Sequence, residues 1–181
     1  FNSGESQSLG NVLLTGATGF MGIHMLHELL TTTDSRICCT LRGKGELSAL
    51  SRLRTLLFYY FDNTFDREFA DGRITVVEAD VTEPVPEIPG GKIDTIINCA
   101  ANVKHFSAGD DIEKVNVESV RNLIDFCLKE GARLVHISTV SVAGESVNGY
   151  PDPSLMLTER MLDFGQNLSN QYVHSKYNAE H

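Results

Sequence analysis

The stretch TGATGFMG, residues 15–22, decides the fold. It follows a short apolar run, NVLLT, and opens a pattern of helical periodicity over residues 20–31. Its glycines, Gly16, Gly19 and Gly22, suit a tight turn, a close approach of the backbone to a pyrophosphate, and close packing of helix on strand. Because the N–H groups of the first helical turn would then face the phosphates, the stretch predicts a dinucleotide site.

Short apolar runs alternate with longer helical patterns along the rest of the chain. They predict strands at 11–15, 36–41, 73–79, 93–100 and 132–139, and helices over 20–31, 46–61, 110–129 and from near 171. Strands this apolar are typical of a parallel sheet that is buried on both faces beneath helices. We therefore expect an α/β fold, a Rossmann-type doubly wound parallel sheet with strand order 3-2-1-4-5.

The length of 181 residues is enough for one domain with a sizeable core. The polar segment 1–10 predicts a linker, and residues 11–181 predict an NADP(H)-binding Rossmann domain. A doubly wound sheet of this type usually continues beyond five strands. We therefore expect this domain to be truncated at its C-terminal end.

Composition excludes several classes of function. The formal net charge of −9 argues against nucleic acid or an anionic membrane surface as partner. No apolar run approaches the ~20 residues that span a bilayer. The four cysteines, Cys38, Cys39, Cys99 and Cys127, fit neither a zinc motif nor a CxxC redox pair. They predict small apolar core residues in a reducing, cytoplasmic compartment, and no metal is expected.

The end of the second predicted strand, TLRGK (40–44), bears on the choice of cofactor. An NAD site normally has Asp or Glu here to bind the ribose 2′-hydroxyl, and residues 40–45 include neither. The planar guanidinium of Arg42 can pair with a 2′-phosphate, and Lys44 adds a second positive charge. This predicts NADPH/NADP+ as cofactor. The alternative is that Arg42 and Lys44 are solvated loop charges.

Two other strand ends carry candidate cofactor residues. Asp80, followed by Val81, can accept a hydrogen bond from the adenine amino group, or it is a simple turn aspartate. In the segment that begins at Asn98, the small residues Ala100 and Ala101 let the chain pass close to a cofactor. The alternative for Asn98 is that it only braces the sheet.

A tyrosine and a lysine near the end of the sequence indicate carbonyl chemistry. Tyr172 and Lys176 are four residues apart on a predicted helix, hence on one face. An ammonium favours the phenolate form of a neighbouring tyrosine, which suits the pair to proton transfer. Hydroxyls gather at the end of the fifth predicted strand, at Ser138, Thr139 and Ser141, where one can hydrogen-bond the same substrate oxygen.

These motifs together resemble an extended short-chain dehydrogenase/reductase. Within that superfamily the chain is most similar to the thioester reductase domains of non-ribosomal peptide synthetases and carboxylic acid reductases. The stretches that carry the narrower match are NVLLTGATGFMGIHML, RLRTLLFYYF, AANVKHFS, DIEKVNVESVRNLI and RLVHISTVSVAG. The family often has glycine where this chain has Ser119, and it continues into a C-terminal substrate domain beyond the position of His181.

The resemblance implies roles for particular residues. Thr139, Tyr172 and Lys176 would be catalytic, and Asn116 would support the lysine through water. The residues implied to bind NADPH are Thr15, Gly16, Thr18, Gly19, Phe20, Gly22, Arg42, Lys44, Asp80, Val81, Asn98, Ala100, Ala101, Asn116, Tyr172 and Lys176.

The resemblance also implies a reaction and a partner. NADPH would reduce an acyl or peptidyl thioester to an aldehyde, with a second hydride giving an alcohol. The thioester would be held on the phosphopantetheine arm of an acyl or peptidyl carrier protein in the same polypeptide. The alternatives are a fatty acyl-CoA reductase, another extended reductase, a sugar-nucleotide epimerase, and an NADP-binding sensor without activity. Such sensors commonly lose the tyrosine or the lysine, and this chain retains Tyr172 and Lys176.

Overall fold

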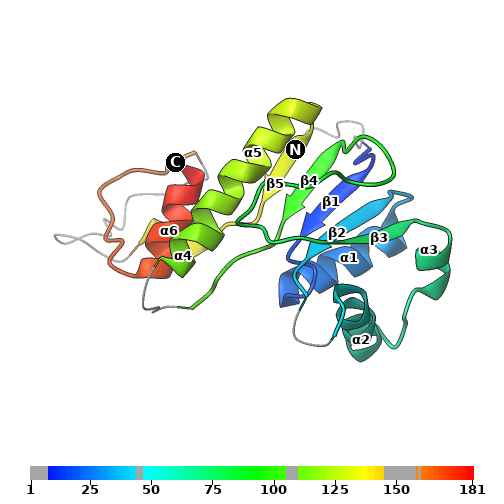
Figure 1. The fold of residues 1–181 in the computed structure, drawn as a ribbon. Coiled ribbons are helices and arrows are strands. Elements are labelled where there is room, and N and C mark those ends of the chain that lie inside the picture. The colour runs from blue at the N-terminus through cyan, green and yellow to red at the C-terminus, as the bar shows by residue number, and fades with distance from the viewer. Residues whose placement is uncertain (1–7, 44–46, 105–109, 145–157, 159) are drawn as a thin grey trace. The chain divides into compact units, whose positions relative to one another are not determined.

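The strands of the described chain form one five-stranded parallel sheet (Figure 1). The computed structural model describes residues 8–43, 47–104, 110–144, 158 and 160–181. The strand order is β3-β2-β1-β4-β5, and every neighbouring pair is parallel. The strands are β1 (Val12–Thr15), β2 (Ile37–Leu41), β3 (Ile74–Glu78), β4 (Thr95–Asn98) and β5 (Arg133–His136). This confirms the predicted Rossmann-type sheet and its order.

The helices follow the predicted ranges with two differences. They are α1 (Phe20–Thr32), α2 (Ala49–Phe61), α3 (Asp66–Ala70), α4 (Asp111–Glu113), α5 (Ser119–Glu130) and α6 (Gln171–Glu180). The short helix α3 was not expected, because five residues are too few to show a period. The helix expected over 110–129 is interrupted by a π-helical turn, η1 (Lys114–Glu118), between α4 and α5.

The side chains of β1 alternate between the two faces of the sheet and so contribute to two separate layers of the core. Val12 and Leu14 point to the face covered by α1 and α2, and Leu13 points to the face where Leu123 of α5 packs. All three of these side chains are fully buried. Each such side chain stabilises the fold by about 1.5–3 kcal/mol relative to an exposed one. The strand that leads into the glycine-rich turn is therefore held firmly on both faces.

Burial on both faces, expected for every strand, holds for β1, β2 and β4. It is wrong for β3, which is mostly half-buried, and for β5, where Val135 is 45% exposed. In the described sheet these two strands lie at the edges, so each has a neighbour on one side only.

The chain divides into two compact units. Unit 1 comprises Phe1–Ala100 and Asn122–His136, and unit 2 comprises Ala101–Arg121 and Ile137–His181. Unit 1 contains the sheet with α1, α2, α3 and most of α5. In unit 2, α6 packs against α4, η1 and the 3-10 turn η2 (Val140–Ala143). The division into a linker and one Rossmann domain stays a prediction. Within the predicted linker, Leu9 packs against the core of unit 1.

The cysteines behave as small core residues where they are fully buried. Cys38 and Cys39 lie in β2, and burial raises the pKa of both thiols. Cys99 and Cys127 are half-buried against the core, and all four thiols are free. No helix in the described ranges combines the length and apolar character needed to cross a membrane.

Candidate active site

The glycine-rich turn is shaped by two kinds of constraint. Gly16 has a φ of 71°, and a Cβ there would lie 2.5 Å from the backbone nitrogen of Ala100. A Cβ on Gly22 would lie 2.1 Å from the carbonyl oxygen of Gly16. Close packing of backbone on backbone therefore requires both of these glycines.

Gly19 differs from the other two. Among the described residues, a Cβ there would meet only the carbonyl oxygen of Gly16, at 3.3 Å. Its φ of −85° is accessible to any residue. A Cβ would make a tight contact here but would not clash as at the other two glycines, so the approach of a ligand to the backbone gives the stronger reason for glycine. The turn thus fits a pyrophosphate at its second glycine.

The start of α1 favours the same ligand. The helix begins after Gly19, and no side chain of the described residues caps it. Its first turn contains no acidic residue, so the positive end of the helix dipole is not neutralised locally. Phe20 exposes 67% of its surface beside this turn. A 13-residue helix with an open N-terminus is a suitable site for an anion.

Asn98 is an internal brace at the carboxyl ends of three strands. Its Oδ1 accepts hydrogen bonds from Thr15 Oγ1 at 2.6 Å and from the Ala100 backbone N–H at 3.1 Å. Its Nδ2 lies 3.0 Å from Nδ1 of His136. Thr15 and Asn98 are both buried. These contacts favour the bracing alternative for Asn98, and they hold Ala100 against the glycine-rich turn. No sequence pattern indicated His136.

Arg42 and Asp80 meet at the ends of β2 and β3. Arg42 Nη1 lies 3.6 Å from Asp80 Oδ2; the Arg42 side chain is largely exposed, and Asp80 is half-buried. Asp80 Oδ1 accepts hydrogen bonds from the Thr82 backbone N–H and hydroxyl. Hydrogen bonds from the Thr82 amide and hydroxyl, followed by the Arg42 guanidinium, lower the pKa of Asp80. Lys44 lies outside the described residues.

Arg52 on α2 is a site residue that no sequence motif indicated. Its Nη2 donates to Thr18 Oγ1 at 3.0 Å, and its Nη1 donates to the Arg42 carbonyl at 2.8 Å. It therefore contacts the glycine-rich turn and the end of β2 together. Helical periodicity placed Arg52 on a helix but gave no sign of partners that are 34 and 10 residues away.

In unit 2, Lys176 connects the catalytic candidates. Its side chain is buried, and Nζ donates to the carbonyl of Ile137 at 2.7 Å. Thr139 follows two residues later, where its Oγ1 accepts a hydrogen bond from the Ser141 N–H and caps η2. Tyr172 lies one turn before Lys176 on α6 and is half-buried. The structure thus brings the segments of Thr139, Tyr172 and Lys176 together within unit 2.

Asn116 reaches the same helix by a different route. It lies in the π-helical turn η1, its Oδ1 accepts from Asn102 N–H at 2.7 Å, and its Nδ2 donates to the Asn102 carbonyl at 3.0 Å. Nδ2 also lies 2.9 Å from Ser175 Oγ, which donates to the Tyr172 carbonyl at 2.7 Å. Asn116 and Ser175 are both buried. Asn116 therefore anchors the backbone of α6, a link that the sequence did not reveal.

A further contact ties Ser138 to α6. The Ser138 hydroxyl hydrogen-bonds the carboxylate of Glu180, one turn beyond Lys176. Ile137 and Ser138 are thus both bonded to α6 immediately before Thr139. No sequence pattern indicated Glu180, because its partner is 42 residues away.

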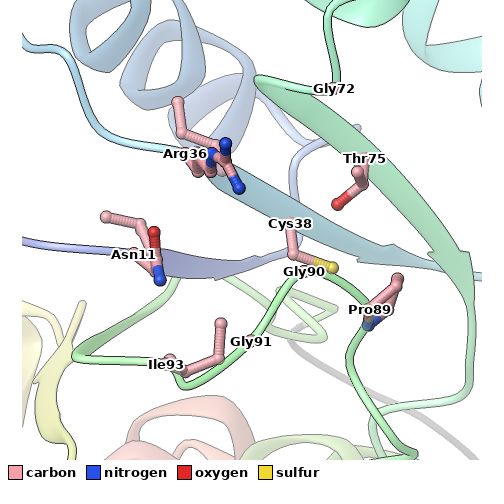
Figure 2. Close-up of a pocket in the computed structure, with 11 residues that line it drawn as sticks. Asn11, Arg36, Cys38, Gly72, Thr75, Pro89, Gly90, Gly91 and Ile93 are labelled. Atoms are coloured by element: carbon pink, nitrogen blue, oxygen red, sulfur yellow. The ribbon is translucent and has the colours of Figure 1, made fainter.

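A small cavity of unit 1 lies at the amino ends of its strands (Figure 2). It has a volume of about 30 Å³ and lies beside Asn11, Arg36 and Gly72, which precede β1, β2 and β3. Figure 2 shows Cys38 and Thr75 directed toward it. Dinucleotides bind at the carboxyl ends of parallel strands, so this cavity has the wrong position for the cofactor.

Comparison with known proteins supports the assignment of the fold. Residues 14–181 match the family of NAD-binding domains described as Male sterility protein. The chain is 42% identical to a thiolation-reductase di-domain from an archaeal non-ribosomal peptide synthetase, with a TM-score of 0.87 over 98% of this chain and 48% of that one. It is 31% identical to the reductase domain of the aureusimine biosynthetic cluster, with a TM-score of 0.76 over 96% and 44%.

A curated relative is the isonitrile lipopeptide synthase of Streptomyces coeruleorubidus, which is 34% identical over 73% of this chain and 9% of its own length. The chain thus spans about half of the similar solved structures and under a tenth of this relative. The strand order of this chain and its match over residues 14–181 together assign the family. The chain belongs to the Male sterility protein family of NAD-binding domains, within the extended short-chain dehydrogenases/reductases.

Proposed function

We propose that this chain is the cofactor-binding part of an NADPH-dependent reductase that releases a carrier-bound acyl or peptidyl thioester as an aldehyde. The single observation that carries the proposal is the Lys176–Ile137 bond, which joins the helix of Tyr172 to the segment of Thr139. The Thr139 hydroxyl, the Tyr172 phenol and the Lys176 ammonium, which carbonyl reduction would need, thus lie on segments that are bonded to each other. Four free thiols suit a reducing compartment, and we propose the cytoplasm as the location.

The residues of unit 1 would hold the cofactor. The open backbone at Gly19 and the uncapped start of α1 would bind the pyrophosphate. Arg42 would pair with the 2′-phosphate, which selects NADPH over NADH. Asp80 would exchange its contact with Arg42 for the adenine amino group. When bound, NADPH supplies the hydride that adds to the thioester carbonyl carbon.

The residues of unit 2 would act on the substrate oxygen. The hydroxyls of Thr139 and Tyr172 would donate hydrogen bonds to this oxygen as negative charge develops on it. Tyr172 would then give its proton to the oxygen, forming a neutral hemithioacetal. The ammonium of Lys176 would stabilise the resulting phenolate. Asn116 and Ser175 would keep α6 in position during this transfer.

The hemithioacetal then breaks down into an aldehyde and a thiol. The carbon–sulfur bond breaks, the hydroxyl proton returns to the Tyr172 phenolate, and the sulfur leaves as a thiolate that takes a proton from solvent. The products are an aldehyde and the free phosphopantetheine thiol. A second hydride from another NADPH would convert the aldehyde into an alcohol.

The relatives support the choice of partner. One is described as a thiolation-reductase di-domain, in which a thiolation domain and a reductase domain occur together. Another belongs to the linear gramicidin synthase of Brevibacillus parabrevis and is 29% identical over 98% of this chain and 4% of that protein. We therefore propose an acyl or peptidyl carrier protein with a phosphopantetheine arm, in the same polypeptide, as partner.

The test is turnover by the full-length protein that contains this chain. Tyr172→Phe removes the proton donor and is expected to lower NADPH oxidation with a carrier-bound thioester about 100- to 10,000-fold. Binding of NADPH should weaken far less than turnover falls, because Tyr172 is one of many residues expected to contact the cofactor. Unchanged turnover in this variant would sink the proposed mechanism.

The same assay distinguishes the other candidate functions. A fatty acyl-CoA reductase would use acyl-CoA in preference to the carrier-bound thioester. An epimerase would retain NAD and act on a sugar nucleotide. A sensor would bind NADPH tightly but oxidise it with neither thioester.

A further inference from the structure

One face of α2 carries a positive, an apolar and a negative side chain in even spacing. Arg54, Phe58 and Asp62 are four residues apart, so they lie along one side of the helix, with Asp62 as its C-cap. We call these three residues the α2 stripe. The buried side chains of α2 are Ala49, Leu53 and Leu57, so the stripe lies away from the core of unit 1.

The centre of the α2 stripe is apolar and exposed. Phe58 exposes 57% of its surface, and the neighbouring Tyr59 exposes 75%. Ser51 and Thr55 lie on the same outward side, and their hydroxyls bond locally: Thr55 donates to the Ser51 carbonyl, and Ser51 Oγ accepts from Ser48 Oγ. Exposed aromatic side chains that gather on one face are typical of a surface that another protein covers.

Asp62 has an unfavourable position for an isolated carboxylate. It ends α2 in the left-handed conformation, with a φ of 52°, and its N–H bonds the Phe58 carbonyl. The negative end of the helix dipole disfavours an acidic side chain here. Asp62 is exposed, and among the described residues no lysine or arginine pairs with it. A positive charge from another molecule would offset this repulsion.

Arg54 supplies such a charge at the other end of the α2 stripe. Its Nη2 lies 3.4 Å from Asp66 Oδ1, and its guanidinium carbon lies 4.8 Å from the centre of the Phe69 ring. These contacts hold the guanidinium in place, yet its side chain stays 41% exposed. Because a guanidinium has five N–H donors, it can bind a second carboxylate beside Asp66.

We propose that the α2 stripe is an interface between two copies of this chain, whose α2 helices pack antiparallel across a twofold axis. With the two Phe58 rings at the axis, position 54 of one copy lies opposite position 62 of the other, because both are four residues from Phe58. Each Arg54 then meets Asp62 of the second copy. The small side chains of Ser51 and Thr55 permit the helix axes to approach to about 8–10 Å.

The order of charges favours a second copy over other partners. A uniformly acidic or uniformly basic surface would match one end of the α2 stripe and repel the other end. A second copy supplies both charges in the required order and adds a matching aromatic side chain between them. This inference is independent of the proposed cofactor and of the proposed reaction.

The experiment is sedimentation velocity of the full-length protein at about 1–200 μM. One helix pair buries less than the ~1,200 Å² of a standard interface, so we expect a weak dimer. The wild type should change from monomer to dimer as its concentration rises, with a dissociation constant of about 10–100 μM.

Charge reversal tests the predicted pairs. Arg54→Asp and Asp62→Arg each place like charges across the axis, and each should raise the dissociation constant about 10-fold or more. A chain with both changes again has opposite charges across the axis, so its dissociation constant should return to within about threefold of wild type. Phe58→Ser removes the central contact and should raise the constant about 30-fold or more.

The matched control is Lys129→Asp on α5. It changes the net charge by the same amount as Arg54→Asp, at an exposed helical position outside the α2 stripe. The dissociation constant should stay at the wild-type value. Thermal unfolding shows whether each variant is folded, and recovery in the double variant separates a lost ion pair from damage to α2.

Four results would overturn the inference. A wild type that stays monomeric at every concentration has no such interface. A dimer that neither single reversal weakens forms through another surface. Failure of the double variant to recover would mean that the helices do not pair antiparallel. If the wild type is monomeric and footprinting finds Phe58 and Tyr59 protected, another part of the same polypeptide covers the α2 stripe.

Discussion

The glycine-rich turn of unit 1 and the helix α6 of unit 2 are held in place by different means. In the turn, backbone packs on backbone, at Gly16 against Ala100 and at Gly22 against Gly16. At α6, side chains make hydrogen bonds to other segments, with Lys176 and Ser175 as the buried examples. A site shaped by backbone leaves no space for an added atom, whereas a site tied by side chains loses one bond at a time. Substitutions should therefore affect the two regions very differently.

The largest effect is expected in the turn. Gly22→Ala would put a methyl group 2.1 Å from the Gly16 carbonyl oxygen, so backbone must move. We expect the free energy of unfolding to fall by about 3 kcal/mol or more, with loss of nucleotide binding. Urea denaturation of the full-length protein, together with NADPH titration, measures both.

Gly19→Ala is the matched control for that variant. Its Cβ would be 3.3 Å from the nearest described atom, and the backbone φ suits alanine. The free energy of unfolding should change by about 1 kcal/mol at most, the usual range for a helix N-cap position. Nucleotide binding should still weaken. Wild-type stability of Gly22→Ala would contradict the contrast between the two glycines.

The next effect is expected at the buried network of unit 2. Asn116→Ala leaves the Asn102 backbone groups and the Ser175 hydroxyl without their partner, at a cost of about 1–3 kcal/mol in unfolding free energy. Turnover should also fall, because α6 loses an anchor. Thermal unfolding and steady-state kinetics measure the two changes.

Asn122→Ala provides the comparison for Asn116. Asn122 makes a long bond of 3.4 Å to the Val81 carbonyl, so its loss should cost under about 0.5 kcal/mol. Equal destabilisation by both variants would show that the hydrogen bonds of Asn116 do not contribute more to the free energy of unfolding than the single bond of Asn122.

The contrast between the two regions also explains what could be predicted from sequence. The positions of the glycines predict the turn and the exposed backbone at Gly19. The place of this motif after a strand indicates the fold type, and the fold type predicts the strand order. The tyrosine and lysine of α6 follow from their spacing of four. Each of these signals is local in the chain.

The missed features depend on partners far away in sequence. Arg52 reaches Thr18, Glu180 reaches Ser138, and Ser175 reaches Asn116, which lies 59 residues earlier. Such pairs have no period, so hydrophobic patterning does not reveal them. The π-helical turn at 114–118 was missed for a related reason, since its side chains follow an ordinary helical pattern and the extra backbone residue leaves no mark in composition.

A smaller effect is expected at the exposed hydrogen bond between Ser138 and Glu180. Ser138→Ala removes the hydroxyl that bonds Glu180, and Glu180→Ala removes the carboxylate. Each should lower the free energy of unfolding by about 0.5–1.5 kcal/mol and lower kcat more than it raises KM for NADPH. Glu180→Gln keeps an acceptor oxygen and should lose less than Glu180→Ala. An effect on KM alone would mean that the Ser138–Glu180 hydrogen bond does not position Thr139.

The smallest effect is expected at the rim of the nucleotide half, and it depends on pH. The Thr82 N–H bond, with help from Arg42, lowers the pKa of Asp80 in the folded protein. The charged carboxylate therefore contributes stability at pH values above its ordinary pKa of about 3.9. That contribution is lost as the pH falls through the lower folded value, because protonation then weakens both contacts.

Asp80→Asn isolates this contribution, because the amide oxygen can still accept from the Thr82 N–H. The difference in unfolding free energy between wild type and Asp80→Asn should be constant above about pH 5 and should close on further acidification. Added salt should reduce only the part that comes from the exposed Arg42 contact. A difference that widens at low pH would mean that the folded pKa of Asp80 is raised instead. Because the Arg42 side chain is exposed and Asp80 is only half-buried, the protein should tolerate this loss, whereas the glycine-rich turn does not tolerate a single methyl group at Gly22.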